Sequence, residues 1–190
     1  MRIRAFIALF LFVSASLTSC LKWKYTSEGG VRLVDSKKFK YNNQNHKNLN
    51  WEIIDTNAVY KLISDYDWRH KPGEKPPVYC HVIRFFSGGQ VLFYNCDKAS
   101  IESMINNPNS GIPGYFIVNG NQIRIERWSG TNGGQLEKYF GILQNHLAIK
   151  FYEQAVRTCH GSYDCLEKQN MYSIWEKQSN LKLIHYQPDW

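Results

Sequence analysis

The chain has 190 residues, a formal charge of 23 − 16 = +7 and a hydrophobic fraction of 43%. Its 10 Phe, 12 Tyr and 6 Trp residues exclude disorder along the whole chain, because burial of so much apolar surface offsets the entropy lost on folding. The length suits one domain, and only the extreme N-terminus is apolar enough to concern a membrane, which excludes a multi-span protein.

Residues 1–19 have the three parts of a secretory signal peptide. Arg2 and Arg4 form a basic start, residues 5–13 are a continuous apolar run, and small residues follow. Residues 17–20 (LTSC) resemble the lipobox of bacterial lipoproteins, in which the cysteine receives a diacylglycerol and becomes the new N-terminus. This resemblance implies lipidation of Cys20. The alternative is an ordinary cleaved signal with an incidental cysteine at its boundary.

Residues 20–50 are interpreted as the lipid anchor and a flexible tether, because they are polar, rich in Lys and Asn, and follow neither helical nor strand periodicity. Five lysines lie nearest the anchor: Lys22, Lys24, Lys37, Lys38 and Lys40. We expect them to be solvated; the alternative is a weak attraction to anionic lipid headgroups, worth at most ~1 kcal/mol each. The basic residues form no stripe, so no nucleic-acid partner is predicted.

Residues 51–190 are predicted to form one β-rich domain, because short β-branched and aromatic segments recur there between turn residues. The predicted strands cover residues 58–64, 78–86, 90–95, 114–118, 121–128, 136–143, 147–152 and 172–176. Residues 99–105 have helical spacing, and a tail at 181–186 alternates in a way that allows pairing.

Three turns join the predicted strands into hairpins. Residues 87–89 (SGG) form a three-residue turn, residues 119–120 (NG) a type I′ turn with two positive φ angles, and residues 144–146 a third turn. Hairpins in strict succession predict an all-β, up-and-down antiparallel meander of about eight strands, which removes its exposed edges by closing into a barrel.

Four cysteines remain if Cys20 is lipidated, and in an exported protein an even number favours disulfides. The three-residue turn at 87–89 places Cys80 directly opposite Cys96 in its hairpin. Cys159 and Cys165 enclose a short loop with a glycine. We predict the disulfides Cys80–Cys96 and Cys159–Cys165. A crossed pairing stays open, as does a set of three soft metal ligands formed by Cys159, His160 and Cys165.

Three phrases in the domain are similar to those of the lipocalin-like domains of small envelope lipoproteins common in Bacteroidota. They are residues 84–91 (RFFSGGQV), 114–125 (GYFIVNGNQIRI) and 139–149 (YFGILQNHLAI). The resemblance implies a lipocalin-like barrel and a lipid anchor. We expect the protein in the cell envelope, anchored to the outer membrane, and the periplasmic and the surface side both stay open. The chain departs from lipocalins proper, because it lacks their G-x-W motif near the first strand.

Residues that could bind a ligand are few. Arg84 interrupts an apolar run, so it either points into the barrel and holds an anionic headgroup or lies on the solvated face. A set of aromatic residues either lines a pocket or fills the barrel: Tyr79, Tyr94, Tyr115, Trp128, Tyr139 and Trp175. No catalytic motif or zinc spacing is present in the sequence, so we expect neither an enzyme nor a cofactor nor a bound metal.

The sequence therefore predicts a membrane-anchored lipoprotein whose lipocalin-like domain binds a small apolar ligand or an envelope partner. The alternative is a structural or assembly protein of the envelope with a filled barrel and no small-molecule ligand. An empty apolar lumen of several hundred Å³ favours the first hypothesis, and a packed interior favours the second.

Overall fold

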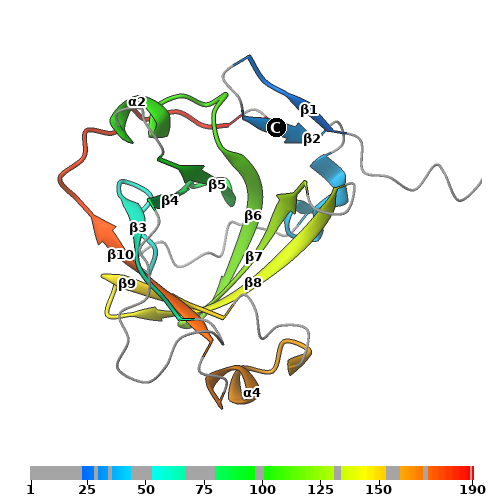
Figure 1. Ribbon diagram of the computed structural model, residues 1–190, viewed down its shortest axis with the longest axis vertical. Helices are drawn as coiled ribbons and strands as arrows, with labels where there is room; N and C mark the ends of the chain where they lie inside the picture. Colours follow the sequence, from blue (N-terminus) through cyan, green and yellow to red (C-terminus); the bar gives the residue numbers. More distant parts are fainter. Residues whose placement is uncertain are drawn as a thin grey trace, which may run out of the picture.

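The computed structural model describes residues 23–27, 30–33, 36–43, 53–66, 80–96, 101–130, 134–152, 159–168, 171–188 and 190. Its centre is a closed barrel of strands in the spatial order β10-β3-β4-β5-β6-β7-β8-β9 (Figure 1). The barrel strands are β3 (Val59–Tyr66), β4 (His81–Phe85), β5 (Gln90–Asn95), β6 (Ile112–Asn119), β7 (Gln122–Ser129), β8 (Gln135–Gln144), β9 (Ala148–Phe151) and β10 (Tyr172–Gln178). Every strand pairs with its neighbour in the chain, and β10 closes the barrel on β3. The predicted all-β, up-and-down, eight-stranded barrel is confirmed.

The first hairpin has the predicted register. Phe85 lies opposite Val91, with residues 87–89 in the turn. The same register brings Cys80 to Cys96, and the two are joined by a disulfide with their Cα atoms 5.1 Å apart. The second predicted disulfide, Cys159–Cys165, is also present. The crossed pairing is therefore wrong, and the two sulfurs of the alternative metal set are bonded to each other.

The other two turns are each shifted by one residue from the prediction. Asn119 pairs with Gln122, so Gly120 and Asn121 are the central residues of the second turn. Gly120 has a φ of 59° and Asn121 has no positive φ, which fits glycine at the first position of a type II′ turn better than the predicted type I′. In the third hairpin Gln144 pairs with Ala148. Each shift moves the register by two residues, so every side chain keeps its face.

The barrel interior is filled by side chains from all eight strands. Alternate strand positions contribute one cluster of buried residues: Tyr60, Leu62, Ile83, Phe85, Val91, Phe93, Phe116, Ile123, Ile125, Tyr139, Leu143, Ile149, Phe151 and Trp175. The rings of Phe93 on β5 and Tyr139 on β8 lie 5.5 Å apart across the barrel, although two strands stand between β5 and β8. Residues 53–57 close one end, where Ile54 joins the cluster.

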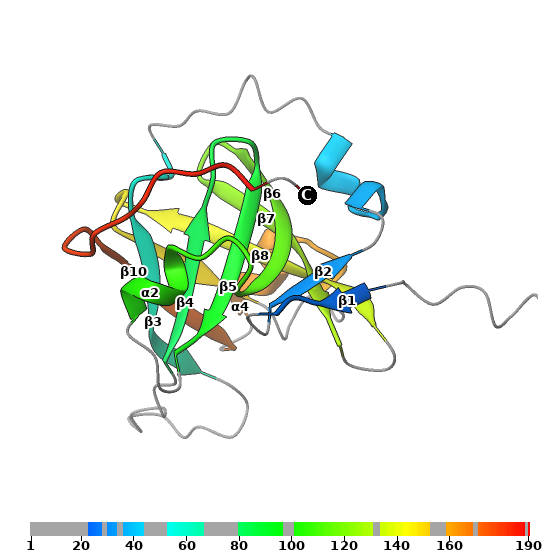
Figure 2. The ribbon, with the colours of Figure 1, turned by 90° about the horizontal axis from the view of Figure 1, so that it is seen from above.

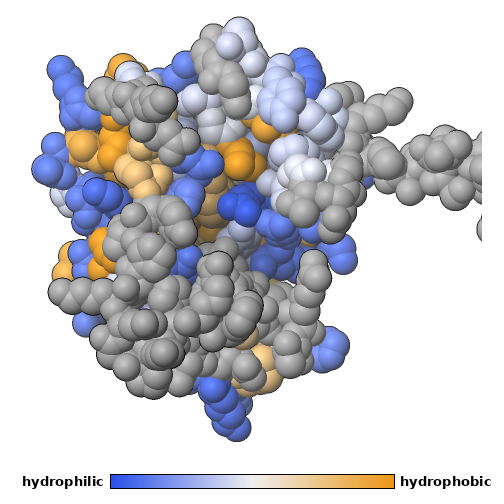
Figure 3. All heavy atoms as spheres, viewed as in Figure 1, coloured by the Kyte–Doolittle hydropathy of each residue, from blue (hydrophilic) through white to orange (hydrophobic). Residues whose placement is uncertain are grey.

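The described residues of the N-terminal segment (23–27, 30–33 and 36–43), which the sequence analysis assigned to a flexible tether, fold against the barrel. They form β1 (Trp23–Tyr25), β2 (Val31–Leu33) and the short 3-10 helices η1 (Ser36–Lys38) and η2 (Lys40–Asn43). Both views place these elements on one side of the molecule (Figures 1 and 2), beside the surface that is pale to blue in Figure 3. Their apolar side chains pack with Tyr115 and Trp128 on the outer face of β6 and β7. The tether prediction is wrong here because this docking depends on single side chains, which leave no periodic pattern.

Glu126 holds this segment in place. Its carboxylate is 1% exposed and accepts hydrogen bonds from the backbone N–H groups of Lys40 (2.6 Å) and Tyr41 (3.3 Å). We expect Glu126→Ala to lower the free energy of unfolding by about 1–3 kcal/mol, because two partly buried donors lose their acceptor. Urea unfolding measures this loss. The exposed Glu176 supplies the control Glu176→Ala, and equal effects of the two variants would contradict the role of Glu126.

Two short helices lie on the outside of the barrel. The helix α4 (Tyr163–Lys168), absent from the prediction, packs with the Cys159–Cys165 disulfide against Phe140 and Tyr152. The helix α2 (Ile101–Ile105) agrees with the helical spacing of 99–105. Among the described residues, no helix is long and apolar enough to span a bilayer.

The C-terminal tail crosses the outside of the barrel from β10 to the N-terminal elements (Figure 2). Residues 181–186 form no strand, so the strand pairing that their alternating pattern allowed does not occur. Side chains hold the tail instead: Asn106 donates to the carbonyl of Lys182 (2.8 Å) and accepts from the N–H of Ile184 (2.7 Å). At the end of the chain, Tyr115 donates to the carbonyl of Trp190 (2.6 Å).

Candidate functional site

A small cavity opens at the end of the barrel where β3 and β5 end and β4 begins. Its volume is about 130 Å³. We call it the mouth and define it by its polar and aromatic lining residues: Asp65, His81, Phe93, Tyr94, Asn95, Arg127, Tyr139 and Trp175. Apart from that of Tyr94, the aromatic rings belong to the interior cluster. The mouth is therefore the top layer of the barrel interior, where polar side chains replace apolar ones.

Arg127 is the central charge of the mouth. On β7 it follows Ile123 and Ile125 on the inward face, and its guanidinium lies over the rings of Phe93 (5.0 Å) and Tyr139 (4.7 Å). Its Nη2 donates to Oε2 of Glu137 at 2.7 Å. Its Nε is buried and has no hydrogen-bond partner among the described residues. The guanidinium is thus held in place by aromatic faces and one carboxylate, with a donor still to be satisfied.

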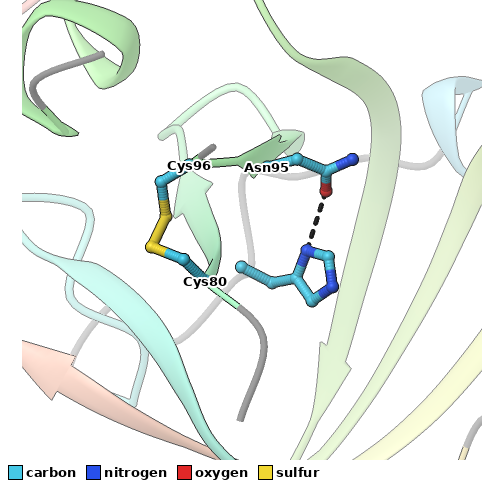
Figure 4. The surroundings of a disulfide bond; sticks show 4 residues. Cys80, Asn95 and Cys96 are labelled. Atoms are coloured by element: carbon cyan, nitrogen blue, oxygen red, sulfur yellow. Dashed lines mark hydrogen bonds between the residues drawn. A yellow bond between two sulfur atoms is a disulfide. The ribbon is translucent and has the colours of Figure 1, made fainter. Parts of the chain in front are cut away.

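His81 and Asn95 form the opposite wall of the mouth. The Nδ1 of His81 and the Oδ1 of Asn95 are 2.8 Å apart, and this pair lies beside the Cys80–Cys96 disulfide (Figure 4). The disulfide and the backbone hydrogen bond from Cys96 to Cys80 (2.8 Å) tie the strand ends together. Alternation places the cysteines on the outer face and the His–Asn pair on the inner face. The disulfide therefore fixes the strand ends that position this wall.

Glu137 keeps its charge to low pH. Burial of the carboxyl raises its pKa, but hydrogen bonds from Arg127, Ser129 and Tyr139 and the charge of Arg127 outweigh burial, so the net pKa lies below its ordinary value.

Among the described residues, no group of three His, Cys, Asp or Glu side chains is placed to hold a metal ion. The mouth consequently offers hydrogen bonds and charge for binding.

The lowered pKa of Glu137 predicts how stability depends on pH. The ion pair stabilises the fold fully above the unfolded-state pKa of about 4.3, and this contribution is lost as pH falls through the lower folded-state pKa. We expect Glu137→Gln to flatten the acid side of the stability–pH curve by no more than about 1 kcal/mol, because solvent screens a partly exposed pair. Urea unfolding between about pH 3 and pH 6 measures this. An acid limb as steep as that of wild type would argue against the pair.

Arg84 does not line the lumen. It lies on the outer face of β4, but it is also not solvated: it is 1% exposed beneath the C-terminal tail. Its Nη1 donates to the carbonyl of Ile105 (2.6 Å) and its Nη2 to that of Ile184 (2.6 Å). Both interpretations from the sequence are wrong, because a third layer, formed by α2 and the tail, covers this part of the sheet.

The predicted aromatic residues are divided between the two faces. Tyr139 and Trp175 point inward and belong to the interior cluster. Tyr115 and Trp128 are buried on the outer face, under the N-terminal segment, and so do not line the lumen. Tyr94 packs in the outer cluster beneath the tail and also borders the mouth at the end of β5. Tyr79 and Cys20 lie outside the described residues.

The sequence analysis missed Arg127, His81 and Asn95 as site residues. One signal was available: Ile123 and Ile125 set the inward face of β7, and the next residue on that face is Arg127. His81 and Asn95 pair directly across β4 and β5, so the cysteine register that predicts the disulfide also predicts their proximity.

Comparisons with protein-family models, with curated proteins and with solved structures find no match to this chain.

Proposed function

We propose that this protein is a lipid-anchored lipoprotein of the bacterial cell envelope, carried in the outer membrane, whose barrel acts as a binding module through its mouth. The anchor is the diacylglycerol on Cys20, as the lipobox at residues 17–20 implies. The disulfides Cys80–Cys96 and Cys159–Cys165 support export, because disulfides persist in oxidising compartments.

The observation that carries the binding proposal is the guanidinium of Arg127 at the mouth, whose buried Nε has no hydrogen-bond partner among the described residues; the filled interior decides where a ligand can lie. The rings of Phe93 and Tyr139 meet across the barrel, and Arg127 covers them. A lipocalin-like carrier of a large apolar ligand needs an empty apolar lumen, and ligand pockets are typically 300–1,000 Å³. The mouth, at about 130 Å³, fits a small group instead. The ligand of this proposal is therefore held at the top of the barrel and not inside it.

The chemistry of the mouth favours a small polar group that both accepts and donates hydrogen bonds. Arg127 provides a fixed donor, and arginine suits a planar acceptor such as a carboxylate. Asp65 provides an acceptor, and aromatic rings form the walls. Such a group is either a small molecule or the end of an envelope partner. The role that we propose is binding, with His81 held by Asn95 and Arg127 held by Glu137 in fixed positions.

Lipidation is tested directly by metabolic labelling with a palmitate analogue. We expect wild-type protein to be labelled and Cys20→Ala to be unlabelled, because the lipobox cysteine is the acceptor. The four disulfide cysteines serve as the internal control, since their sulfurs are already bonded. Equal labelling of wild type and Cys20→Ala would contradict the anchor.

Binding at the mouth is tested by native mass spectrometry of the protein released from its own membranes. We expect a co-purifying small molecule or partner that is lost in Arg127→Met. The matched control is Arg124→Met, which removes an exposed arginine from the outer face of the same strand. Retention of the bound species by Arg127→Met would contradict the assignment of the mouth.

A second candidate function is that of a structural or assembly protein without a small-molecule ligand. The same filled interior favours it, because the barrel then serves as a rigid core. Under this function the native mass spectra of wild type, Arg127→Met and Arg124→Met all show the acylated chain alone.

A further inference from the structure

We propose that β1, β2, η1 and η2 form a membrane-contact face, which rests on an anionic lipid surface and sets the orientation of the barrel on the bilayer. We call these elements the N-terminal face. The inference rests on the proposed lipidation of Cys20 and adds to it the side of the barrel that meets the lipid.

The first argument is reach. Trp23 follows Cys20 by three residues, and a fully extended chain spans at most about 3.6 Å per residue, or about 11 Å in total. Trp23 is fixed to the barrel: it lies in β1, which pairs with β2, and its ring lies 5.1 Å from that of Trp128. An acyl anchor at Cys20 therefore holds this face within about 11 Å of the membrane, whatever conformation the intervening residues adopt.

The second argument is the distribution of charge. Residues 21–43 contain six basic and two acidic residues, a net charge of +4, whereas residues 44–190 contain fifteen basic and fourteen acidic residues, a net charge of +1. Nearly all of the net charge of the mature chain thus lies in the segment next to the anchor. A basic cluster beside a lipid anchor is attracted to anionic headgroups, at about 1 kcal/mol per residue near the surface.

The third argument is the type and position of the side chains. Lys24, Lys37, Lys38 and Lys40 are all exposed, and Tyr25 beside them is 65% exposed. They lie in the N-terminal elements, which also contain or flank Val31 and Phe39, and these two side chains form an apolar cluster with Tyr115 and Trp128. Figures 1 and 2 place all four elements on the same side, and Figure 3 shows a surface there with little strongly hydrophobic area. Lysine with tyrosine or tryptophan is the composition that suits the headgroup region.

These three observations change the role of the lysines. In a long flexible tether they would be solvated, as the sequence analysis expected. Fixed on a folded face close to the anchor, they meet the headgroups together. The basic face then adds a second signal for membrane binding to the acyl anchor, because attraction to anionic headgroups adds to the burial of the acyl chains.

The test is lysine acetylation of the full-length acylated protein in vesicles of phosphatidylglycerol and phosphatidylethanolamine, read by peptide mass spectrometry. We expect Lys24, Lys37, Lys38 and Lys40 to react about threefold or more slowly than Lys168 and Lys182, exposed lysines elsewhere on the molecule. Raising the salt to about 1 M, where the Debye length is about 3 Å, should relieve the protection of the four lysines in part.

Charge-reversal variants make the test specific. Lys37→Glu with Lys38→Glu should reduce the protection of Lys24, and the matched pair Lys168→Glu with Lys182→Glu should leave it unchanged. If the acylated protein floats with the vesicles but all six lysines react alike, the membrane-contact face is overturned and the anchor stands. If the protein carries no acyl group and does not float, both proposals are overturned.

Discussion

Replacing Arg84 with alanine is expected to lower the free energy of unfolding by about 2–4 kcal/mol, because a buried and a partly buried carbonyl lose charge-assisted donors. The guanidinium joins three parts of the chain: β4, the carbonyl of Ile105 at the end of α2, and the carbonyl of Ile184 in the tail. It also lies over the rings of Phe86 (5.0 Å) and Tyr186 (4.7 Å). Denaturant unfolding measures the loss.

The same variant should release the tail from the barrel before the barrel unfolds. We expect faster hydrogen exchange over residues 181–188 in Arg84→Ala at denaturant concentrations where the barrel strands stay protected. Lys138→Ala is the control, since Lys138 is exposed on β8 and should cost less than about 0.5 kcal/mol. A stable Arg84→Ala variant with an unchanged tail would show that Arg84 does not clamp the tail.

Replacing Phe93 with alanine is expected to cost about 3–5 kcal/mol, because it removes a ring from the centre of the barrel and leaves a cavity. Phe93 is 5% exposed and contacts both Tyr139 and the guanidinium of Arg127. The control Leu147→Ala removes an apolar side chain that is 63% exposed in a turn and should change stability by less than about 0.5 kcal/mol. Thermal and urea unfolding of the two variants give the comparison.

The cavity in Phe93→Ala should also be measurable with a probe. The space left in Phe93→Ala lies between the interior rings and the mouth, so it offers a small apolar molecule the ring faces that Phe93 covered, and benzene should raise the melting temperature of Phe93→Ala and leave that of wild type unchanged. Stabilisation of the wild type by benzene to the same extent would mean that the barrel already contains an empty apolar space.

The barrel and its first hairpin were predictable from the sequence because they follow local rules. Period-2 alternation defines the strands, and the length of the turn at 87–89 fixes the register that joins Cys80 to Cys96. The rule for Asn-Gly turns gave the wrong central residues, since Gly120 fits the first position of a type II′ turn. That error had no further consequence, because a shift of two residues preserves the faces.

The packing of the N-terminal elements and of the C-terminal tail on the outer face of the barrel was not predictable by the same rules. Each depends on one buried polar residue that joins distant segments: Glu126 binds the backbone at residues 40 and 41, and Arg84 binds the backbone at residues 105 and 184. Such contacts depend on tertiary structure and leave no periodic signal. The functional consequence is large, because two predicted ligand-lining residues, Tyr115 and Trp128, are instead the docking surface for the N-terminal segment.

The mouth was predictable from the sequence only in part. The faces of β4, β5 and β7 can be read from alternation, which places His81, Asn95 and Arg127 inward. Their convergence on one cavity depends on the closure of the barrel and on the filling of its interior below them. The sequence therefore contained the orientation of each residue, whereas the volume and depth of the site follow only from packing.

The most direct test of the filled interior is a titration of the wild-type protein with a fluorescent long-chain fatty acid. Our account predicts no saturable one-to-one binding, because Phe93, Tyr139 and Arg127 occupy the space that the acyl chain would need. Saturable one-to-one binding that unlabelled fatty acid displaces, and that Phe93→Trp weakens, would contradict it and would assign the protein to the carriers of apolar ligands.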